Sequence, residues 1–62
     1  MSLQGTRAVV VGLARSGVAA AEFLARRGAA VVATDVKAED QLPEDVLRLR
    51  EQGIRLDLGG HH

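Results

Sequence analysis

Short apolar runs alternate along the chain with longer mixed segments, and glycines separate them. The run 8–11, Ala-Val-Val-Val, contains no polar residue, a pattern typical of a strand buried on both faces of a parallel sheet. The run 30–33, Ala-Val-Val-Ala, repeats the pattern and ends at Thr34 and Asp35. In 54–58 apolar and charged residues alternate, which predicts a third strand with one face toward solvent.

Two helices are expected between these strands. Residues 17–27 are rich in Ala and Leu, Ser16 precedes them as a candidate N-cap, and Gly28 is placed to end the helix. The polar residues 37–41 predict a loop, after which Pro43 suits the first position of a second helix. Four acidic residues are interpreted as part of this loop and helix start: Glu39, Asp40, Glu44 and Asp45.

The order strand, helix, strand, helix, strand implies parallel strands joined by right-handed crossovers. We therefore predict an α/β fold, a Rossmann-like βαβαβ unit whose strands lie in the spatial order 3-2-1. In a doubly wound sheet a fourth strand pairs with the free edge of the first, so the sheet is expected to be incomplete. An open Val-rich edge of this kind is expected to favour self-association.

The 62 residues allow one small domain or part of one, spanning 1–62. A chain this short buries a limited share of its surface, and no Cys is present to staple it with disulfides. A piece of a larger domain, or an oligomer, is therefore expected. Residues 1–3 are a candidate vector leader, and residues 61–62 are either native histidines or the start of a purification tag.

The amino-acid composition argues against several classes of binding partner. Eight basic and eight acidic residues give a formal net charge of zero, and Phe23 is the single aromatic residue, which argues against a nucleic-acid partner. No apolar run is long enough for a membrane span, so no membrane partner is expected, and the lack of Cys fits a cytoplasmic location. His61 and His62 are adjacent and point apart in a strand, so no metal site is expected.

The segment 12–17, Gly-Leu-Ala-Arg-Ser-Gly, joins the first strand to the first helix. It matches Gly-x-Ala-x-x-Gly, one residue away from the dinucleotide fingerprint Gly-x-Gly-x-x-Gly. Helix N-termini present unpaired N–H groups and partial positive charge, which suit phosphate oxygens. Gly12 permits the tight turn, Gly17 permits close packing of helix on strand, and Ala14 replaces the glycine that admits a pyrophosphate. The turn predicts a phosphate-binding element, unless the glycines serve the turn and packing alone.

Asp35 ends the second strand, 18 residues after Gly17, where a carboxylate accepts from ribose hydroxyls in dinucleotide-binding folds. The alternative is that Asp35 bonds a neighbouring loop N–H. Ser16 is either a cap or a phosphate contact, Arg15 is either solvated or ligand-binding, and Lys37 faces solvent unless an anion reaches it. No nucleophile with His and carboxylate partners and no Gly-Lys-Ser/Thr sequence is present, so neither a catalytic residue nor a bound cofactor is expected here.

The succession of these motifs resembles the D-glutamate-adding members of the Mur ligase family. That family commonly has a Gly-Leu-Gly-x-Ser/Thr-Gly turn, a Leu-x-x-Arg-Gly helix end and a Leu-Gly-Gly-His sequence close to the third strand. Ala14 departs from the first motif, and the last motif would make His61 native. The resemblance covers essentially the whole chain, and the matching stretches are 9–17, 23–28, 32–35, 42–44 and 53–61.

The resemblance implies the N-terminal part of the first of three domains, the domain that grips the UDP moiety of UDP-N-acetylmuramoyl-L-alanine. Ser16 would offer its N–H and hydroxyl to phosphate, and residues 35–37 would border the uridine. The implied UDP-binding set is Gly12, Ala14, Arg15, Ser16, Gly17, Asp35, Val36 and Lys37.

The same resemblance implies a longer parent enzyme that uses ATP and Mg²⁺, held by its other domains, to add D-glutamate to this substrate. The reaction belongs to cytoplasmic peptidoglycan biosynthesis, and through it to cell shape and division. The segment alone is expected to be inactive. Two alternatives remain open from the residues: an NAD(P)-binding module of an oxidoreductase or regulatory protein, and a structural fragment without a ligand.

Overall fold

The computed structural model describes residues 2–60, which form one three-stranded parallel sheet with helices. The strands lie in the order β1-β2-β3, and β2 is hydrogen-bonded to both neighbours. The expected α/β class and parallel pairing are confirmed, and the order 3-2-1 describes the same neighbours counted from the opposite edge. The elements are β1 (Arg7–Val11), α1 (Arg15–Arg26), β2 (Ala30–Asp35), η1 (Glu39–Gln41), α2 (Glu44–Leu47), η2 (Arg48–Gln52) and β3 (Arg55–Leu58), where η marks a 3-10 helix.

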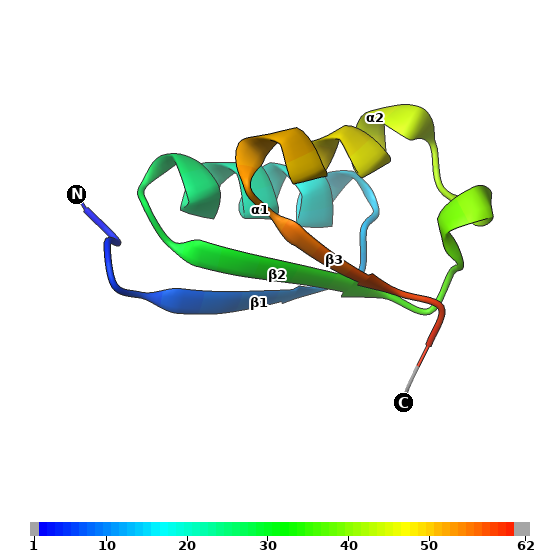
Figure 1. The fold of residues 1–62 in the computed structure, drawn as a ribbon, viewed down its shortest axis with the longest axis horizontal. Coiled ribbons are helices and arrows are strands. Elements are labelled where there is room, and N and C mark those ends of the chain that lie inside the picture. The colour runs from blue at the N-terminus through cyan, green and yellow to red at the C-terminus, as the bar shows by residue number, and fades with distance from the viewer. Residues whose placement is uncertain (1, 61–62) are drawn as a thin grey trace.

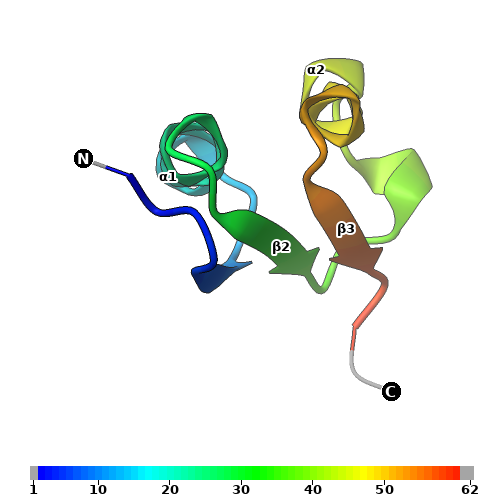
Figure 2. The ribbon, with the colours of Figure 1, turned by 60° about the vertical axis from the view of Figure 1, so that its left-hand side comes forward.

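Both crossovers pass over the same face of the sheet, as Figures 1 and 2 show. Crossovers between parallel strands are as a rule right-handed, so two crossovers that step to the next strand in the same direction place both helical segments on one side. Side chains that alternate toward this side form the core with residues from the helices. The buried apolar residues are Val10, Leu13, Ala21, Val31, Ala33, Val46, Leu49 and Ile54.

The opposite face of the sheet carries no helix among the described residues (Figure 2). Val10 is 9% exposed, whereas its neighbours Val9 and Val11 are 68% and 84% exposed. The expectation that the first strand is buried on both faces is therefore wrong for this part of the chain. An apolar run provides side chains that can be buried on both faces of the sheet, but the path of the neighbouring segments decides which face is covered.

The first helix begins at Arg15, two residues earlier than expected, and Ala14 occupies the N-cap position with extended backbone. The assignment of Ser16 as N-cap is therefore wrong, and Ser16 lies exposed in the first turn of α1. Gly12, at φ +93°, already turns the chain away from β1, so helical backbone starts before Ser16 is reached. At the other end Gly28 stops the helix as expected, with its N–H donating to the carbonyl of Ala25.

The second connection is less regular than its sequence suggests. The expected loop at 37–41 contains the short 3-10 helix η1, and Gln41 accepts the N–H of Ala38 at 2.9 Å to hold it. Pro43 is the N-cap of α2 rather than its first helical residue. The four-residue α2 continues directly into η2, and the prediction of one helix ending at Gly53 is met by two short segments in succession.

The segment before β1 is held against the end of α1. The N–H of Leu3 donates to the carbonyl of Arg27 at 2.7 Å, which ties the segment before β1 to the end of α1. Met1, His61 and His62 lie outside the described residues, so the leader and tag interpretations stay predictions. Within residues 2–60 no helix has the length and apolar character needed to cross a bilayer.

Candidate functional site

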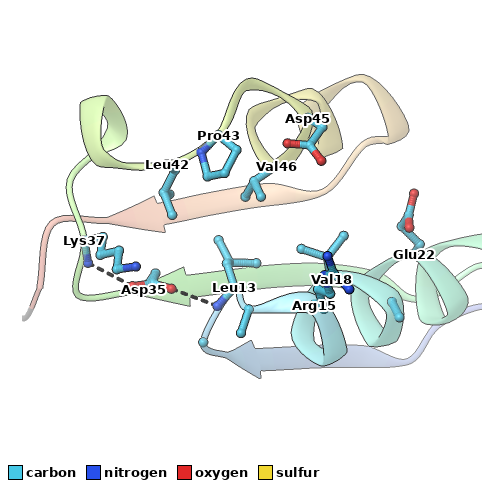
Figure 3. Close-up of a pocket in the computed structure, with 13 residues that line it drawn as sticks. Leu13, Arg15, Val18, Glu22, Asp35, Lys37, Leu42, Pro43, Asp45 and Val46 are labelled. Atoms are coloured by element: carbon cyan, nitrogen blue, oxygen red, sulfur yellow. Dashed lines mark hydrogen bonds between the residues drawn. The ribbon is translucent and has the colours of Figure 1, made fainter.

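A cleft of about 670 Å³ opens at the carboxyl ends of β1 and β2, between α1 and the segment that leads into α2 (Figure 3). This volume lies within the range of small-molecule sites, and open parallel sheets bind ligands at the carboxyl ends of their strands. Five of the eight predicted binding residues line it: Gly12, Ala14, Arg15, Asp35 and Lys37. The other three, Ser16, Gly17 and Val36, do not line this cleft, and Val36 is exposed outside it.

The two glycines of the turn have separate structural tasks. Gly12 adopts φ +93°, a conformation that disfavours any side chain, and its N–H donates to the carbonyl of Thr34 at 2.7 Å. Gly17 has an ordinary φ, but a Cβ at this position would collide with the carbonyl oxygen of Gly12. The first turn of α1 therefore lies directly against the end of β1, as predicted from the spacing of the glycines.

The N-terminus of α1 presents free donors. In the described chain the amides of Arg15, Ser16 and Gly17 donate to no protein oxygen, and Val18 is the first residue to bond back, to the carbonyl of Ala14 at 2.9 Å. The first turn contains no acidic residue whose carboxylate would compete for these donors. Free N–H groups and the positive end of the helix dipole together favour an anionic group at this position.

The Asp35 carboxylate bridges the two loops that border the cleft (Figure 3). Oδ2 accepts from the N–H of Leu13 at 2.8 Å, and Oδ1 accepts from the N–H of Lys37 at 2.9 Å. The amides of Lys37 and then Leu13 hold the pKa of the Asp35 carboxyl below its ordinary value, because hydrogen bonds donated to the charged form stabilise it. The structure thus shows the loop-bonding alternative for Asp35, with the carboxylate ionised at neutral pH.

Part of the cleft was not foreseen from the sequence. Figure 3 shows Leu42, Pro43 and Val46 on one wall, facing Leu13 and Val18 on the other. The only sequence signal was helical spacing, since Leu42 and Val46 are four residues apart. No local pattern indicates that these two walls meet, because they are separated by more than twenty residues of chain.

Charges of both signs surround the cleft. Arg15 and Lys37 supply cations near the turn, while Glu22 and Asp45 place carboxylates farther along α1 and on the opposite wall. Glu22 accepts a hydrogen bond from Nε2 of Gln52 at 2.9 Å, which ties α1 to η2. Among residues 2–60 no group of three or more His, Cys, Asp or Glu side chains is arranged to hold a metal ion. The free N–H groups at the start of α1, rather than the balance of charges, therefore favour an anionic ligand at this end of the cleft.

Comparison with known proteins points to one enzyme family, although no protein-family model matches the chain. A protein of Acidobacterium capsulatum and one of Geotalea daltonii are each 49% identical to it over 61 residues, or 98% of this chain. A protein of Solibacter usitatus is 70% identical over 43 residues, or 69% of the chain. All three are described as UDP-N-acetylmuramoylalanine–D-glutamate ligase.

The chain spans 13%, 14% and 10% of the length of these three relatives. The matches to the first two include the glycine turn, both helical connections and all three strands, so they cover the whole cleft described above. On the strength of this near-complete coverage, the chain belongs, as a segment, to the family of UDP-N-acetylmuramoylalanine–D-glutamate ligases.

Proposed function

We propose that this chain is the N-terminal, UDP-binding portion of a ligase that joins D-glutamate to UDP-N-acetylmuramoyl-L-alanine in peptidoglycan biosynthesis. The observation that carries the proposal is the set of three unpaired amides at the start of α1, at Arg15, Ser16 and Gly17, beside a cleft of nucleotide size. The names of the relatives support the choice of substrate.

In this proposal the diphosphate binds at the N-terminus of α1 and the uridine lies near residues 35–37. Arg15 and Lys37 both line the cleft and would offset the negative charge of the diphosphate. Ala14, the N-cap of α1, lines the cleft, so its methyl group would lie beside the ligand. In this proposal the methyl group is tolerated because a single nucleoside diphosphate requires less close backbone approach than a dinucleotide. The departure from the usual glycine is therefore compatible with a UDP ligand.

In the proposed parent reaction ATP phosphorylates the substrate carboxylate, which gives an acyl phosphate and ADP. The amine of D-glutamate then attacks the acyl phosphate to give an amide and release phosphate. This chain does not fit a role in that step, because it has no Gly-Lys-Ser/Thr sequence for ATP and its described part has no cluster of metal ligands. We therefore propose that ATP and Mg²⁺ bind to other domains of a cytoplasmic parent enzyme. The segment alone is expected to be inactive.

The proposal is tested by titrating the longer parent protein with UDP-N-acetylmuramoyl-L-alanine and, in parallel, with NADH. We expect the UDP substrate to bind more tightly than the dinucleotide. In an isotope-labelled sample, addition of UDP should shift the amide signals of residues 12–17 in particular. Tighter binding of NADH would replace the ligase proposal with a dinucleotide-binding function, and unchanged signals at residues 12–17 would remove the phosphate site.

A further inference from the structure

Hydrogen bonds around Asp35 connect the carboxyl ends of all three strands. The side chain receives the amide of Leu13 after β1 and the amide of Lys37 after β2, at 2.8 Å and 2.9 Å. The N–H of Gly59, after β3, donates to the carbonyl of Lys37 at 2.9 Å and lies 3.2 Å from the carbonyl of Asp35. Asp35 therefore lies at the junction of the three segments that end the strands.

Few other contacts of the main chain hold the β1–α1 turn in place. The N–H of Gly12 bonds to the carbonyl of Thr34, and the next amide, that of Leu13, bonds to Asp35. The following four amides, 14–17, donate to no protein oxygen in the described structure. The side chain of Leu13 is buried in the core, so a shift of its backbone would displace a packed residue as well. Besides this packing, two main-chain donors tie the turn to β2, and one of them needs the Asp35 carboxylate.

We propose that Asp35 is a positioning residue for the phosphate-binding turn. Its carboxylate holds the amides of Leu13 and Lys37 at a set separation, and this keeps the free N–H groups of α1 at the correct distance from the loop that carries Lys37. A carboxylate can accept both bonds at once, whereas an asparagine has one carbonyl oxygen and a donor NH₂ group. The hydrogen-bond clamp stands independently of the ligand, and only its effect on affinity rests on the proposed function.

The first test is made without ligand, by comparing amide hydrogen exchange in the parent protein and its Asp35→Asn variant. We expect exchange at Leu13 or Lys37 to rise by about tenfold, the scale of one lost hydrogen bond, while Gly12 keeps its protection. The matched control is Asp45→Asn, which removes the same charge from the opposite wall of the cleft. Unchanged exchange at both amides in Asp35→Asn, or an equal change in Asp45→Asn, would overturn the clamp.

A direct measurement on the unaltered protein covers the case in which Asp35→Asn fails to fold. Scalar couplings across hydrogen bonds should connect the amide nitrogens of Leu13 and Lys37 to the carboxyl carbon of Asp35. Two such couplings establish that a single side chain bonds both loops. Absence of both couplings in a folded, ligand-free sample would contradict the proposal.

The second test asks what the clamp does for the substrate. We expect Asp35→Asn to raise KM for the UDP substrate by about tenfold with little change in kcat, because the binding turn loses its position. If Asp35 acted only through its negative charge, its removal would favour an anionic ligand and KM would fall. An increase in KM without any change in ligand-free exchange would instead indicate direct ligand contact and overturn the positioning role. Lack of UDP-substrate binding by the unaltered protein would defeat the proposed function, and the exchange result would still decide the clamp.

Discussion

The two faces of the sheet show what a uniform apolar run does and does not determine. Val9, Val10 and Val11 are consecutive and identical in type, yet Val10 is buried under α1 while its two neighbours are exposed on the opposite face. The difference follows from the pleat of the strand and from two crossovers that cover the same side. Burial at these positions is therefore a property of topology, since the side chains themselves are equivalent.

The polarity of the open face changes from one edge of the sheet to the other. Register pairs Val9 with Val32 and Val32 with Arg55, so this face runs from apolar at β1 to charged at β3. The covered face is apolar on every strand and leads into the cleft at its carboxyl end. The self-association expected from the sequence should therefore concentrate at β1, where apolar surface and an edge unpaired within the described residues coincide.

The largest expected difference between the faces comes from truncating the core. Leu49 in η2 is fully buried on the covered face, so Leu49→Ala should reduce the free energy of unfolding by about 2–5 kcal/mol, because it loses buried apolar surface and leaves a cavity. Val11→Ala on the open face is the paired control and should change it by less than about 0.5 kcal/mol. Circular dichroism during urea unfolding measures both. Equal losses would mean that the open face is covered in solution.

The close packing of α1 against the turn after β1 can be tested by a substitution at Gly17. Ala normally stabilises a helix relative to Gly, but a Cβ at Gly17 would collide with the carbonyl of Gly12. Gly17→Ala should therefore destabilise the protein by about 1–3 kcal/mol, as in other overpacked sites. Thermal unfolding supplies the measurement, and a stabilised variant would show that α1 does not lie directly against β1.

A substitution at Ser16 should affect ligand binding without affecting the stability of α1. Ser16 does not line the cleft, but its hydroxyl is exposed in the first turn of α1, where the proposal places the diphosphate. Ser16→Ala removes this hydroxyl and keeps the N–H, so binding of the UDP substrate to the parent protein should weaken by about 1 kcal/mol, the scale of one hydrogen bond. Because Ala14 rather than Ser16 occupies the N-cap, the unfolding free energy should stay nearly constant. Isothermal titration and a melting curve on the same sample give both quantities. Loss of stability with unchanged affinity would restore the capping role.

A polar substitution on the open face should affect association more than stability. Val11→Thr keeps a β-branched side chain, and we expect a change of less than about 0.5 kcal/mol in unfolding free energy. The weight-average mass at high concentration, measured by sedimentation, should fall relative to the unaltered chain. If the two chains sediment identically as oligomers, the open valine face is not the contact.

The smallest expected effect is the pH dependence that Asp35 contributes. Its pKa is lowered in the folded state, first by the amide of Lys37 and then by that of Leu13. The associated stability is therefore fully present above the ordinary carboxyl pKa of about 3.9 and is lost as the pH falls through the lower folded value. Arg50 lowers the pKa of Glu39 in the same direction, so Asp35→Asn should reduce the acid sensitivity of the melting temperature without abolishing it. An identical pH profile in the variant would argue against a charged clamp in solution.

Much of the local structure was predictable because it depends on neighbouring residues. Glycines mark the turn after β1 and the end of α1, and alternating residues mark the one-sided third strand. The cap at Ser16 was predicted wrongly because side-chain preference favours Ser, whereas the backbone path set by Gly12 started the helix earlier. Residue preferences indicate where a helix could begin, but the direction in which the chain leaves the strand determines the residue at which it does begin.

The sequence by itself determined the order of elements, the parallel pairing, the glycine turn and the position of Asp35 at the end of β2. Tertiary structure alone decided which face of the valine strand is covered, that Leu42 and Val46 close the cleft, and that Asp35 bonds Leu13 and Lys37. The physical reason is the sequence distance over which each effect acts. Helix and strand propensity and capping involve residues a few positions apart, whereas burial and clefts require segments far apart in the chain to come into contact. That meeting is governed by the handedness of the crossovers and by packing against the sheet.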